Sequence, residues 1–208
     1  MVHTDRRLAS PSIMRLIVER WSPRSFTDAL ISDEELRAIL EAARWAPSQY
    51  NSQPWRFMYA RRGTENWDLF LSWLKPVNQR WAKSASALVY VASCKTMIPR
   101  MTPDPVFSRT HSYDAGAAAM LILLQATYAG WAAHTMSGVS NIEETHAGLK
   151  LPDSFALETA IAIGKQGALS MLPDDLAVRE KPSMRVALDE IIYDGTFAGQ
   201  ENPYRKAQ

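Results

Sequence analysis

The chain has 208 residues, of which 47% are hydrophobic and 22% charged, and 23 Lys and Arg against 22 Asp and Glu give it a net charge of +1. This composition is that of a globular domain, and it excludes wholesale disorder and a chain-wide basic field for nucleic acid. A single cysteine, Cys94, excludes an internal disulfide and any cysteine-based zinc or iron–sulfur set. The first ten residues carry charges with no apolar run behind them, so we expect no signal peptide and a soluble, cytoplasmic protein.

Two helices are expected in the N-terminal quarter. Proline is favoured at the first position of a helix, so Pro11 predicts a helix over residues 10–20. Ser32 and Glu35 have the spacing of a capping box and are followed by apolar residues on one helical face, so a second helix begins there and ends before Pro47. The next predicted elements are a strand over Trp55–Ala60 and an aromatic-rich helix around Asn66–Leu74.

Two continuous apolar runs, residues 85–93 and 157–164, have the composition of strands that are buried on both faces. Between them, residues 96–110 contain three prolines, and we expect an irregular loop that could act as a lid. A long helix over residues 113–131 follows this loop. The remaining predictions are an extended piece over Ala132–Val139, a small helix over Asn141–Leu149 and a short last strand over Leu188–Tyr193.

Residues Ala115–Ala133 carry no charge over nineteen positions, which is the length of a transmembrane helix. Alanine and glycine dominate the segment, polar side chains interrupt it, and it lacks the flanking Lys and Arg clusters of a membrane span. We therefore expect a buried central helix, which could pack against its own symmetry mate, and no membrane association. Its small residues recur in steps of four and three, with Ile122 in the one gap: Ala115, Ala119, Ala126, Ala129 and Ala133.

Several familiar catalytic signatures are missing from the sequence. It has neither a G-x-G-x-x-G fingerprint nor a G-x-S-x-G elbow, and Gly164–Gly167 (GKQG) lacks the Ser or Thr of a phosphate-binding P-loop. The four histidines share no metal-ligand spacing. We therefore expect neither a protein nucleophile nor a metal ion to carry the chemistry, and we expect Cys94 to be a buried packing residue.

Two cations and a hydroxyl alternate along the segment that follows the first predicted helix. Pro23 forces Ser22 out of the helical region, so the chain is extended here. Alternate residues of an extended chain point the same way, which puts Arg20, Ser22 and Arg24 on one side. Such a set suits a phosphate, although an isolated pattern of this kind is also typical of a solvated loop.

A second polar cluster lies between the second predicted helix and the first predicted strand. Pro47 and Pro54 bound a turn, and the residues between them supply several donors and acceptors within six positions. The cluster could read the edge of a heterocycle with carbonyl and N–H groups, or it could satisfy its own turn. Its polar members are Ser48, Gln49, Asn51 and Gln53.

The order of these motifs resembles the FMN-dependent nitroreductase family from about residue 14 to residue 197. R-x-S-x-R-x-F begins at Arg20, A-P-S-x-x-N-x-Q-P-W-R-F begins at Ala46, and N-x-x-W-A begins at Asn78. Three later pieces keep the family order, and Arg185 resembles its C-terminal basic residue. These pieces are Tyr113–Ala118 at the start of a long helix, Ala133–Gly138 after it, and Ala160–Gly164 as a strand.

The resemblance implies a single domain, residues 1–208, with an α+β three-layer sandwich around a mostly antiparallel sheet. It also implies a domain-swapped homodimer with FMN in two clefts at the subunit interface. Carried over by position, the FMN phosphate and ribityl chain would be held by Arg20, Ser22, Arg24 and Arg185, with the backbone of Trp21 between them. The flavin would be lined by Pro47, Ser48, Gln49 and Asn51 of the partner subunit, by Asn78 at its polar edge, and by Met136, Ser137 and Gly138.

The activity implied by the resemblance is hydride transfer from NADH or NADPH, through flavin N5, to a small-molecule electron acceptor such as a nitroaromatic, a quinone or an activated alkene. The same fold could instead serve flavin fragmentation, dehalogenation or flavin carriage. A helical dimerisation module without a cofactor is the non-enzymatic alternative. Three side chains could contact substrate or simply pack: Phe107, His111 and Tyr113.

Overall fold

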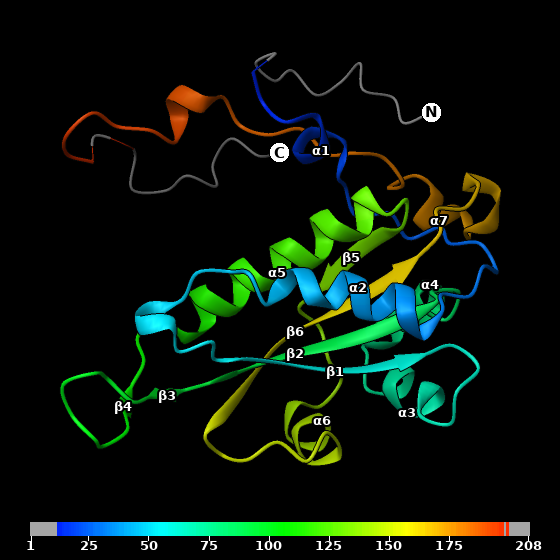
Figure 1. Ribbon diagram of the computed structural model, residues 1–208. Helices are drawn as coiled ribbons and strands as arrows, with labels where there is room; N and C mark the ends of the chain where they lie inside the picture. The colour runs from blue at the N-terminus through cyan, green and yellow to red at the C-terminus, as the bar shows by residue number, and fades with distance from the viewer. Residues whose placement is uncertain (1–11, 198, 200–208) are drawn as a thin grey trace.

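The computed structural model describes residues 12–197 and residue 199, and a four-stranded antiparallel sheet in the order β1-β2-β6-β5 forms its centre (Figure 1). The inner strands, β2 and β6, are buried over residues 87–93 and 160–164. This confirms the two central strands that were predicted from continuous apolar runs. The strands of the sheet are β1 (Trp55–Arg61), β2 (Ala87–Cys94), β5 (Ala132–Met136) and β6 (Phe155–Gly164).

Two helices, α2 (Asp33–Ala43) and α5 (His111–Tyr128), cover one face of the sheet. The amphipathic α2 buries Leu36, Ile39 and Ala43 against the sheet and α5. Burial of such side chains is the main stabilising contribution to a layer of this kind.

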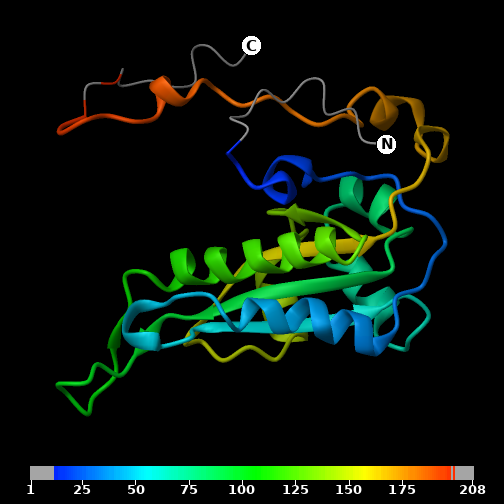
Figure 2. The same ribbon diagram turned by 45° about the horizontal axis from the view of Figure 1, so that its top comes forward.

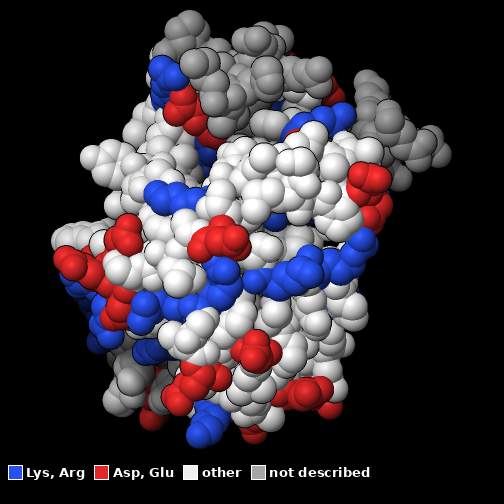
Figure 3. All heavy atoms as spheres, turned by 90° about the vertical axis from the view of Figure 1, so that its right-hand side faces the viewer, with Lys and Arg blue, Asp and Glu red and all other residues white. Residues whose placement is uncertain are grey.

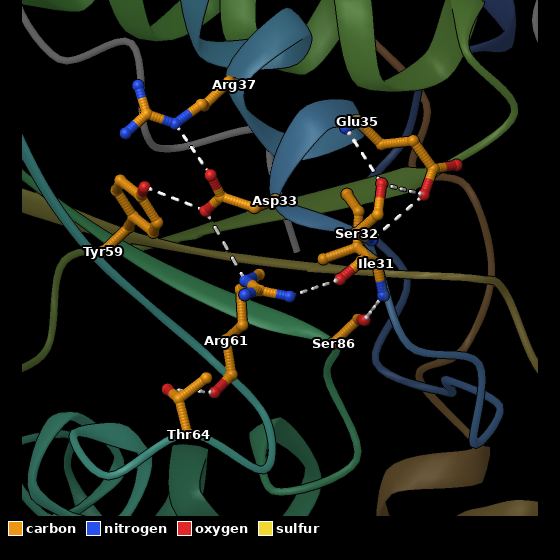
Figure 4. A network of polar contacts seen from close by, with 9 residues as sticks. All are labelled: Ile31, Ser32, Asp33, Glu35, Arg37, Tyr59, Arg61, Thr64 and Ser86. Atoms are coloured by element: carbon orange, nitrogen blue, oxygen red, sulfur yellow. Dashed lines mark hydrogen bonds and ion pairs between the residues drawn. The ribbon is translucent and has the colours of Figure 1, made fainter.

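Polar contacts fix the start of α2 to β1 (Figure 4). The predicted capping box is confirmed, since Ser32 Oγ accepts from the Glu35 amide at 3.1 Å and Glu35 Oε2 accepts from the Ser32 amide at 3.0 Å. One residue further on, Asp33 accepts from Tyr59 Oη at 3.1 Å and from Arg37 Nε at 2.8 Å. The helix therefore has a fixed starting point above the first strand.

Three short helices, α3 (Trp67–Ser72), α4 (Pro76–Ala82) and α6 (Ile142–Gly148), lie on the opposite side of the sheet. An aromatic cluster joins this layer to β2, where Tyr90 lies 5.4 Å from Phe70 and 5.7 Å from Trp73 between ring centroids. The sequence did not predict α4. Five of the seven tryptophans are buried in the core: Trp55, Trp67, Trp73, Trp81 and Trp131.

The small-residue stripe of α5 packs inside the chain, so the proposed symmetry mate is the wrong partner for it. Ala115, Ala119 and Ala126 are buried against α2 and the sheet together with Ile122. Ala129 is exposed at the helix end, and Ala133 belongs to β5. Small side chains allow α5 to approach the sheet closely. No helix within the described residues is long and apolar enough to cross a membrane.

The ends of the described chain and the proline-rich connection differ from the predictions. The first helix, α1, covers only Arg15–Glu19, and Pro11 lies outside the described residues. The predicted loop contains a small hairpin of β3 (Thr96–Met97) and β4 (Val106–Phe107). Cys94 is half-buried rather than fully buried.

The predicted last strand is wrong. The 3-10 helix η4 (Leu188–Glu190) occupies this region, and the apolar side chains there are exposed instead of pairing with the sheet. Two short elements, η3 (Leu169–Met171) and α7 (Asp174–Ala177), precede it. From about residue 181 the chain runs as an arm across the α1 side of the molecule, separate from the sheet (Figures 1 and 2).

Candidate functional site

The segment over residues 20–26 leaves α1 as an extended chain. Arg20 has φ −62° and ψ 125°, and its Nη1 donates to Ser22 Oγ at 3.3 Å, so these two side chains lie on the same side as the alternation predicts. Trp21 is half-buried beside them, and Pro23 is buried. The segment therefore presents a guanidinium and a hydroxyl together.

Arg20 and Arg185 line the same hollow, although 165 positions separate them in the sequence. The hollow has a volume of about 680 Å³ and lies between α1, α5 and the C-terminal arm. The two guanidinium groups give its otherwise apolar wall a positive charge. The other lining residues are Ile13, Ile17, Val18, Met120, Met184, Val186, Ala187 and Leu188.

Arg24 turns toward a carboxylate instead of the Arg20 hollow. Its Nη1 lies 3.9 Å from Glu180 Oε2, and its backbone amide donates to Glu180 Oε1 at 2.7 Å. Arg24 also lines a second hollow of about 300 Å³ together with Arg80 and Lys83. On the side that carries α4 and α7, Lys and Arg side chains gather in a band bordered by acidic groups (Figure 3).

A histidine of β5 lies beneath the same segment. His134 Nδ1 is 3.0 Å from the Pro23 carbonyl oxygen, and its ring lies 4.6 Å from that of Trp81. Burial lowers the pKa of His134 to about 4, with smaller contributions of the same sign from the charges of Arg24 and Arg20. The ring is therefore neutral at pH 7, and both cations lie close enough to act on it.

The predicted flavin-edge residues of α4 and β5 are neighbours. The Gly138 carbonyl accepts from the Lys75 amide at 3.2 Å, and Asn78 lies in the first turn of α4, with its amide bonded to the Lys75 carbonyl at 2.7 Å. Met136 is buried at the end of β5, whereas Ser137 is exposed. The pairs Trp81–His134 and Trp81–Phe26 connect this group to the 20–26 segment.

The predicted polar turn is held at the start of α5. The Gln49 amide donates to Asp114 Oδ2 at 3.1 Å, and Thr110 Oγ1 donates to Gln49 Oε1 at 2.9 Å. Ser48 Oγ accepts from the Gln53 amide at 2.9 Å. The turn carries left-handed backbone at three non-glycine residues, Tyr50 (φ 52°), Asn51 (φ 56°) and Gln53 (φ 47°), while Pro47 and Asn51 are exposed.

One chain does not bring all the predicted site residues together. The polar turn 47–53 lies at the opposite end of the molecule from the 20–26 segment (Figures 1 and 2). The helix between them, α5, has 18 residues and so is about 27 Å long. Residues 20–24, 75–78, 134–138 and 185 therefore form one group, and residues 47–51 form another.

A polar cluster that the sequence did not predict joins β2, β6 and α5. Ser93 Oγ lies 2.7 Å from His111 Nδ1 and donates to Glu158 Oε1, which also accepts from Ser112 Oγ at 2.8 Å. The carboxylate and the hydroxyl approach the same ring nitrogen, so the group lacks the geometry of an acyl-transfer triad. Among the described residues, no three His, Cys, Asp or Glu side chains gather as a metal site.

Comparison with known proteins gives consistent matches. A model of the nitroreductase family matches residues 17–165. A crystal structure described as an oxidoreductase containing FMN is 42% identical, with a TM-score of 0.89, over 96% of this chain and 100% of that chain. A putative nitroreductase from Desulfovibrio desulfuricans, solved in complex with FMN, is 26% identical with a TM-score of 0.69, over 91% and 99% of the two chains.

Among curated proteins, the oxygen-insensitive NADPH nitroreductase of Helicobacter acinonychis is 41% identical over 83 residues, which are 39% of this chain and 38% of that protein. A putative NADH dehydrogenase/NAD(P)H nitroreductase of Archaeoglobus fulgidus is 46% identical over 48 residues, which are 23% and 28% of the two chains. The matched regions thus span less than two fifths of these relatives' lengths.

Proposed function

Since this chain belongs to the nitroreductase family, we propose that it binds FMN and uses NADH or NADPH to reduce a small organic electron acceptor. Nitroaromatics, quinones and activated alkenes are the acceptor classes that we propose. The observation that carries the proposal is that Arg20 and Arg185 line one hollow and that Arg20 Nη1 also donates to the Ser22 hydroxyl. The FMN-containing relative, at 42% identity over nearly the whole chain, supports the same cofactor.

The side chains of the 20–24 segment fit the phosphate of FMN. Guanidinium groups and hydroxyls donate charge-assisted hydrogen bonds to phosphate oxygens, each contributing roughly 1.5–3 kcal/mol. Arg20 and Arg185 offer such donors at one hollow, the Ser22 hydroxyl lies 3.3 Å from Arg20 Nη1, and Arg24 lies two residues further along the segment. We propose that these four residues hold the phosphate and ribityl chain, with the backbone of Trp21 between them.

We propose that the flavin ring lies against Asn78, Met136, Ser137 and Gly138 of the same chain. Asn78 brings an amide, and the turn after β5 brings backbone N–H groups, both of which can pair with the ring carbonyls. When bound, FMN supplies the group that accepts hydride from the nicotinamide and passes it to the acceptor. The protein residues bind and orient the reactants and exclude water, and none of the residues assigned here is required as an acid or base.

A second copy of the chain is proposed to complete the site. Residues 47–51 lie too far from the 20–24 segment to line the same ring within one chain, so we place them over the flavin of the partner subunit. Large exposed apolar patches are typical of interfaces. Both α5 and the arm expose large apolar side chains, and four of them line one hollow: Met120, Met184, Val186 and Leu188.

Purification of the full chain with added FMN tests the proposed function. We expect a yellow protein whose chromophore co-migrates with FMN after denaturation and loses its visible absorption when NADH or NADPH is added anaerobically. Addition of a nitroaromatic or a quinone should then restore the absorption. A protein that takes up no flavin would contradict the proposal, whereas flavin binding without reduction by either nicotinamide would point to flavin carriage.

A further inference from the structure

Two side chains from distant parts of the sequence hold consecutive backbone groups of the 20–26 segment. We propose that Glu180 and His134 are positioning residues that fix this segment for phosphate and thereby make the site select FMN over riboflavin. The inference rests on the proposed function, because it concerns the same phosphate end of the site.

Glu180 holds two successive amides. Its Oε1 accepts from the Arg24 amide at 2.7 Å and from the Ser25 amide at 2.8 Å. The side chain is only 5% exposed, and its Oε2 has no hydrogen bond within the described residues and lies 3.9 Å from Arg24 Nη1. A buried carboxylate oxygen that accepts two amide hydrogens fixes the local backbone strongly, because leaving those groups unpaired costs free energy.

His134 holds the residue before those amides. A carbonyl oxygen can only accept, so the proton must lie on His134 Nδ1, which donates to the Pro23 carbonyl at 3.0 Å. The neutral ring packs on Trp81 at 4.6 Å between centroids, and it therefore acts as a fixed donor without adding charge. The 20–26 segment is thus held at Pro23, Arg24 and Ser25 in a row.

The end of the segment near Ser25 and Thr27 has anchors of its own. The loss of Glu180 or His134 should therefore affect mainly residues 20–24, which face the phosphate. Ser25 Oγ donates to the Ala168 carbonyl at 2.6 Å, and the Thr27 amide donates to the Lys165 carbonyl at 2.8 Å. Loss of Glu180 or His134 would therefore free residues 20–24 while the connection to the sheet persists. The affinity of the site for FMN then falls, because the freed segment must be ordered again when FMN binds.

The negative charge of Glu180 shows that this residue would help by positioning the backbone and not by attracting the phosphate. A carboxylate next to a phosphate-binding segment repels the phosphate and partly neutralises Arg24, so its charge opposes binding. Its hydrogen bonds must then outweigh this effect. Glu180→Gln keeps an acceptor oxygen and removes the charge, whereas Glu180→Ala removes both.

The test compares the dissociation constants of FMN and riboflavin for the full chain, measured by quenching of flavin fluorescence after removal of bound cofactor. We expect Glu180→Ala and His134→Phe each to weaken FMN binding by about tenfold or more while riboflavin binding changes by less than about threefold. Phe keeps a ring on Trp81 and removes the donor. Two conservative variants should retain the preference for FMN. Glu180→Gln keeps the acceptor oxygen, and His134→Asn keeps a donor at the position of Nδ1.

Controls make the result specific. Asp175→Ala removes a nearby carboxylate that pairs with Arg80 at 2.8 Å and should leave both affinities unchanged. Equal losses of FMN and riboflavin affinity, or an unchanged preference for FMN in both Glu180→Ala and His134→Phe, would overturn the inference. A wild-type chain that binds neither flavin would instead overturn the proposed function. If Glu180→Ala fails to fold, His134→Phe carries the same test through the neighbouring carbonyl.

Discussion

At the scale of single residues, the arginines of this chain differ in what their side chains face. Arg20 and Arg185 face the same hollow, whereas Arg24 faces Glu180, and Arg80 makes a two-bond ion pair with Asp175. Exposed ion pairs such as the last contribute little to stability. Two guanidinium groups brought to one hollow from distant segments are the more informative arrangement.

The sequence predicted the residues that we propose for the phosphate, but it did not predict the residues that support their segment. The alternation of Arg20 and Ser22 is a local property, and an extended segment brings it out in any fold. Glu180 lies 156 positions from Arg24, and no motif marks it. His134 lies within a family-like motif, but nothing in that motif shows that its ring meets Pro23. Such contacts depend on how β5 and the chain after α7 pack.

The titration of His134 gives a pH dependence of stability. Its pKa is about 4 in the folded chain and near 6.5 when unfolded, so the unfolded state binds more protons between these values. Stability should therefore be fully present above about pH 6.5 and fall by roughly 1.4 kcal/mol per pH unit toward pH 4. Urea unfolding of the cofactor-free protein at several pH values measures this.

The matched control for that pH dependence is His134→Asn, which keeps a donor but does not titrate. Subtracting its profile removes the contribution of the carboxylates. The difference between the two proteins should be flat above pH 6.5 and should change between pH 6.5 and 4. A difference that stays constant over the whole range would contradict a buried neutral His134.

At the scale of elements, two kinds of pattern gave predictions that the structure confirms. One is a helix cap that forms within a few residues, and the other is an apolar run that is buried on both faces of the sheet. The capping box fixed the start of α2, and the continuous apolar runs identified β2 and β6. The stripe on α5 also indicated burial correctly, but the spacing of small residues does not say which surface covers them. In the structure, α2 and the sheet cover them.

Two of the elements that the sequence misjudged, α4 and the predicted last strand, lack such patterns. The helix α4 has seven residues and one proline at its start, so its periodicity is too short to identify. Four of the residues 188–193 are apolar and favour a strand, but the segment belongs to an arm that has no strand partner within the described chain. A β-run becomes a strand only when the topology brings an open sheet edge to it.

The turn after β6 is packed too closely at Gly167 to accept a side chain. A Cβ at Gly167 would lie 2.8 Å from Ser25 Oγ, 2.7 Å from Met171 Sδ and 3.1 Å from the Phe26 backbone carbon. Gly167→Ala should therefore lower the free energy of unfolding by about 1–3 kcal/mol and loosen the anchor of the 20–26 segment. Urea unfolding measures the loss.

Gly116→Ala on α5 is the matched control, because no atom of the described chain lies within 4 Å of a methyl group added there. Alanine is the better helix former, so this variant should be neutral or slightly stabilising. A Gly167→Ala protein as stable as wild type would show that the segment can move aside without cost.

At the scale of the whole molecule, the chain carries two separate parts of one proposed site. The residues that we propose for the FMN phosphate lie beside α1 and the arm, while the polar turn 47–53 lies at the start of α5 (Figure 2). The motifs showed which residues resemble a flavin site, but they did not show that the residues fall into two groups. That separation comes from the length and direction of α5, and it is why we propose that the functional unit is a homodimer.

A mixed dimer tests this central proposal most directly. One chain carries Arg20→Ala with Arg185→Ala, and the other carries Ser48→Ala with Asn51→Asp, where Asp tolerates the left-handed backbone of Asn51. Each variant alone should bind FMN at least about 100-fold more weakly, since each loses two or more hydrogen-bonding groups at both of its sites. Co-expression with two different affinity tags isolates the mixed dimer.

The measurement is the FMN content per mixed dimer. We predict one FMN per dimer, because one site pairs the intact phosphate residues of one chain with the intact polar turn of the other. A mixed dimer that binds no FMN while the wild-type dimer binds two would mean that all these residues act within one chain, and would contradict the shared site.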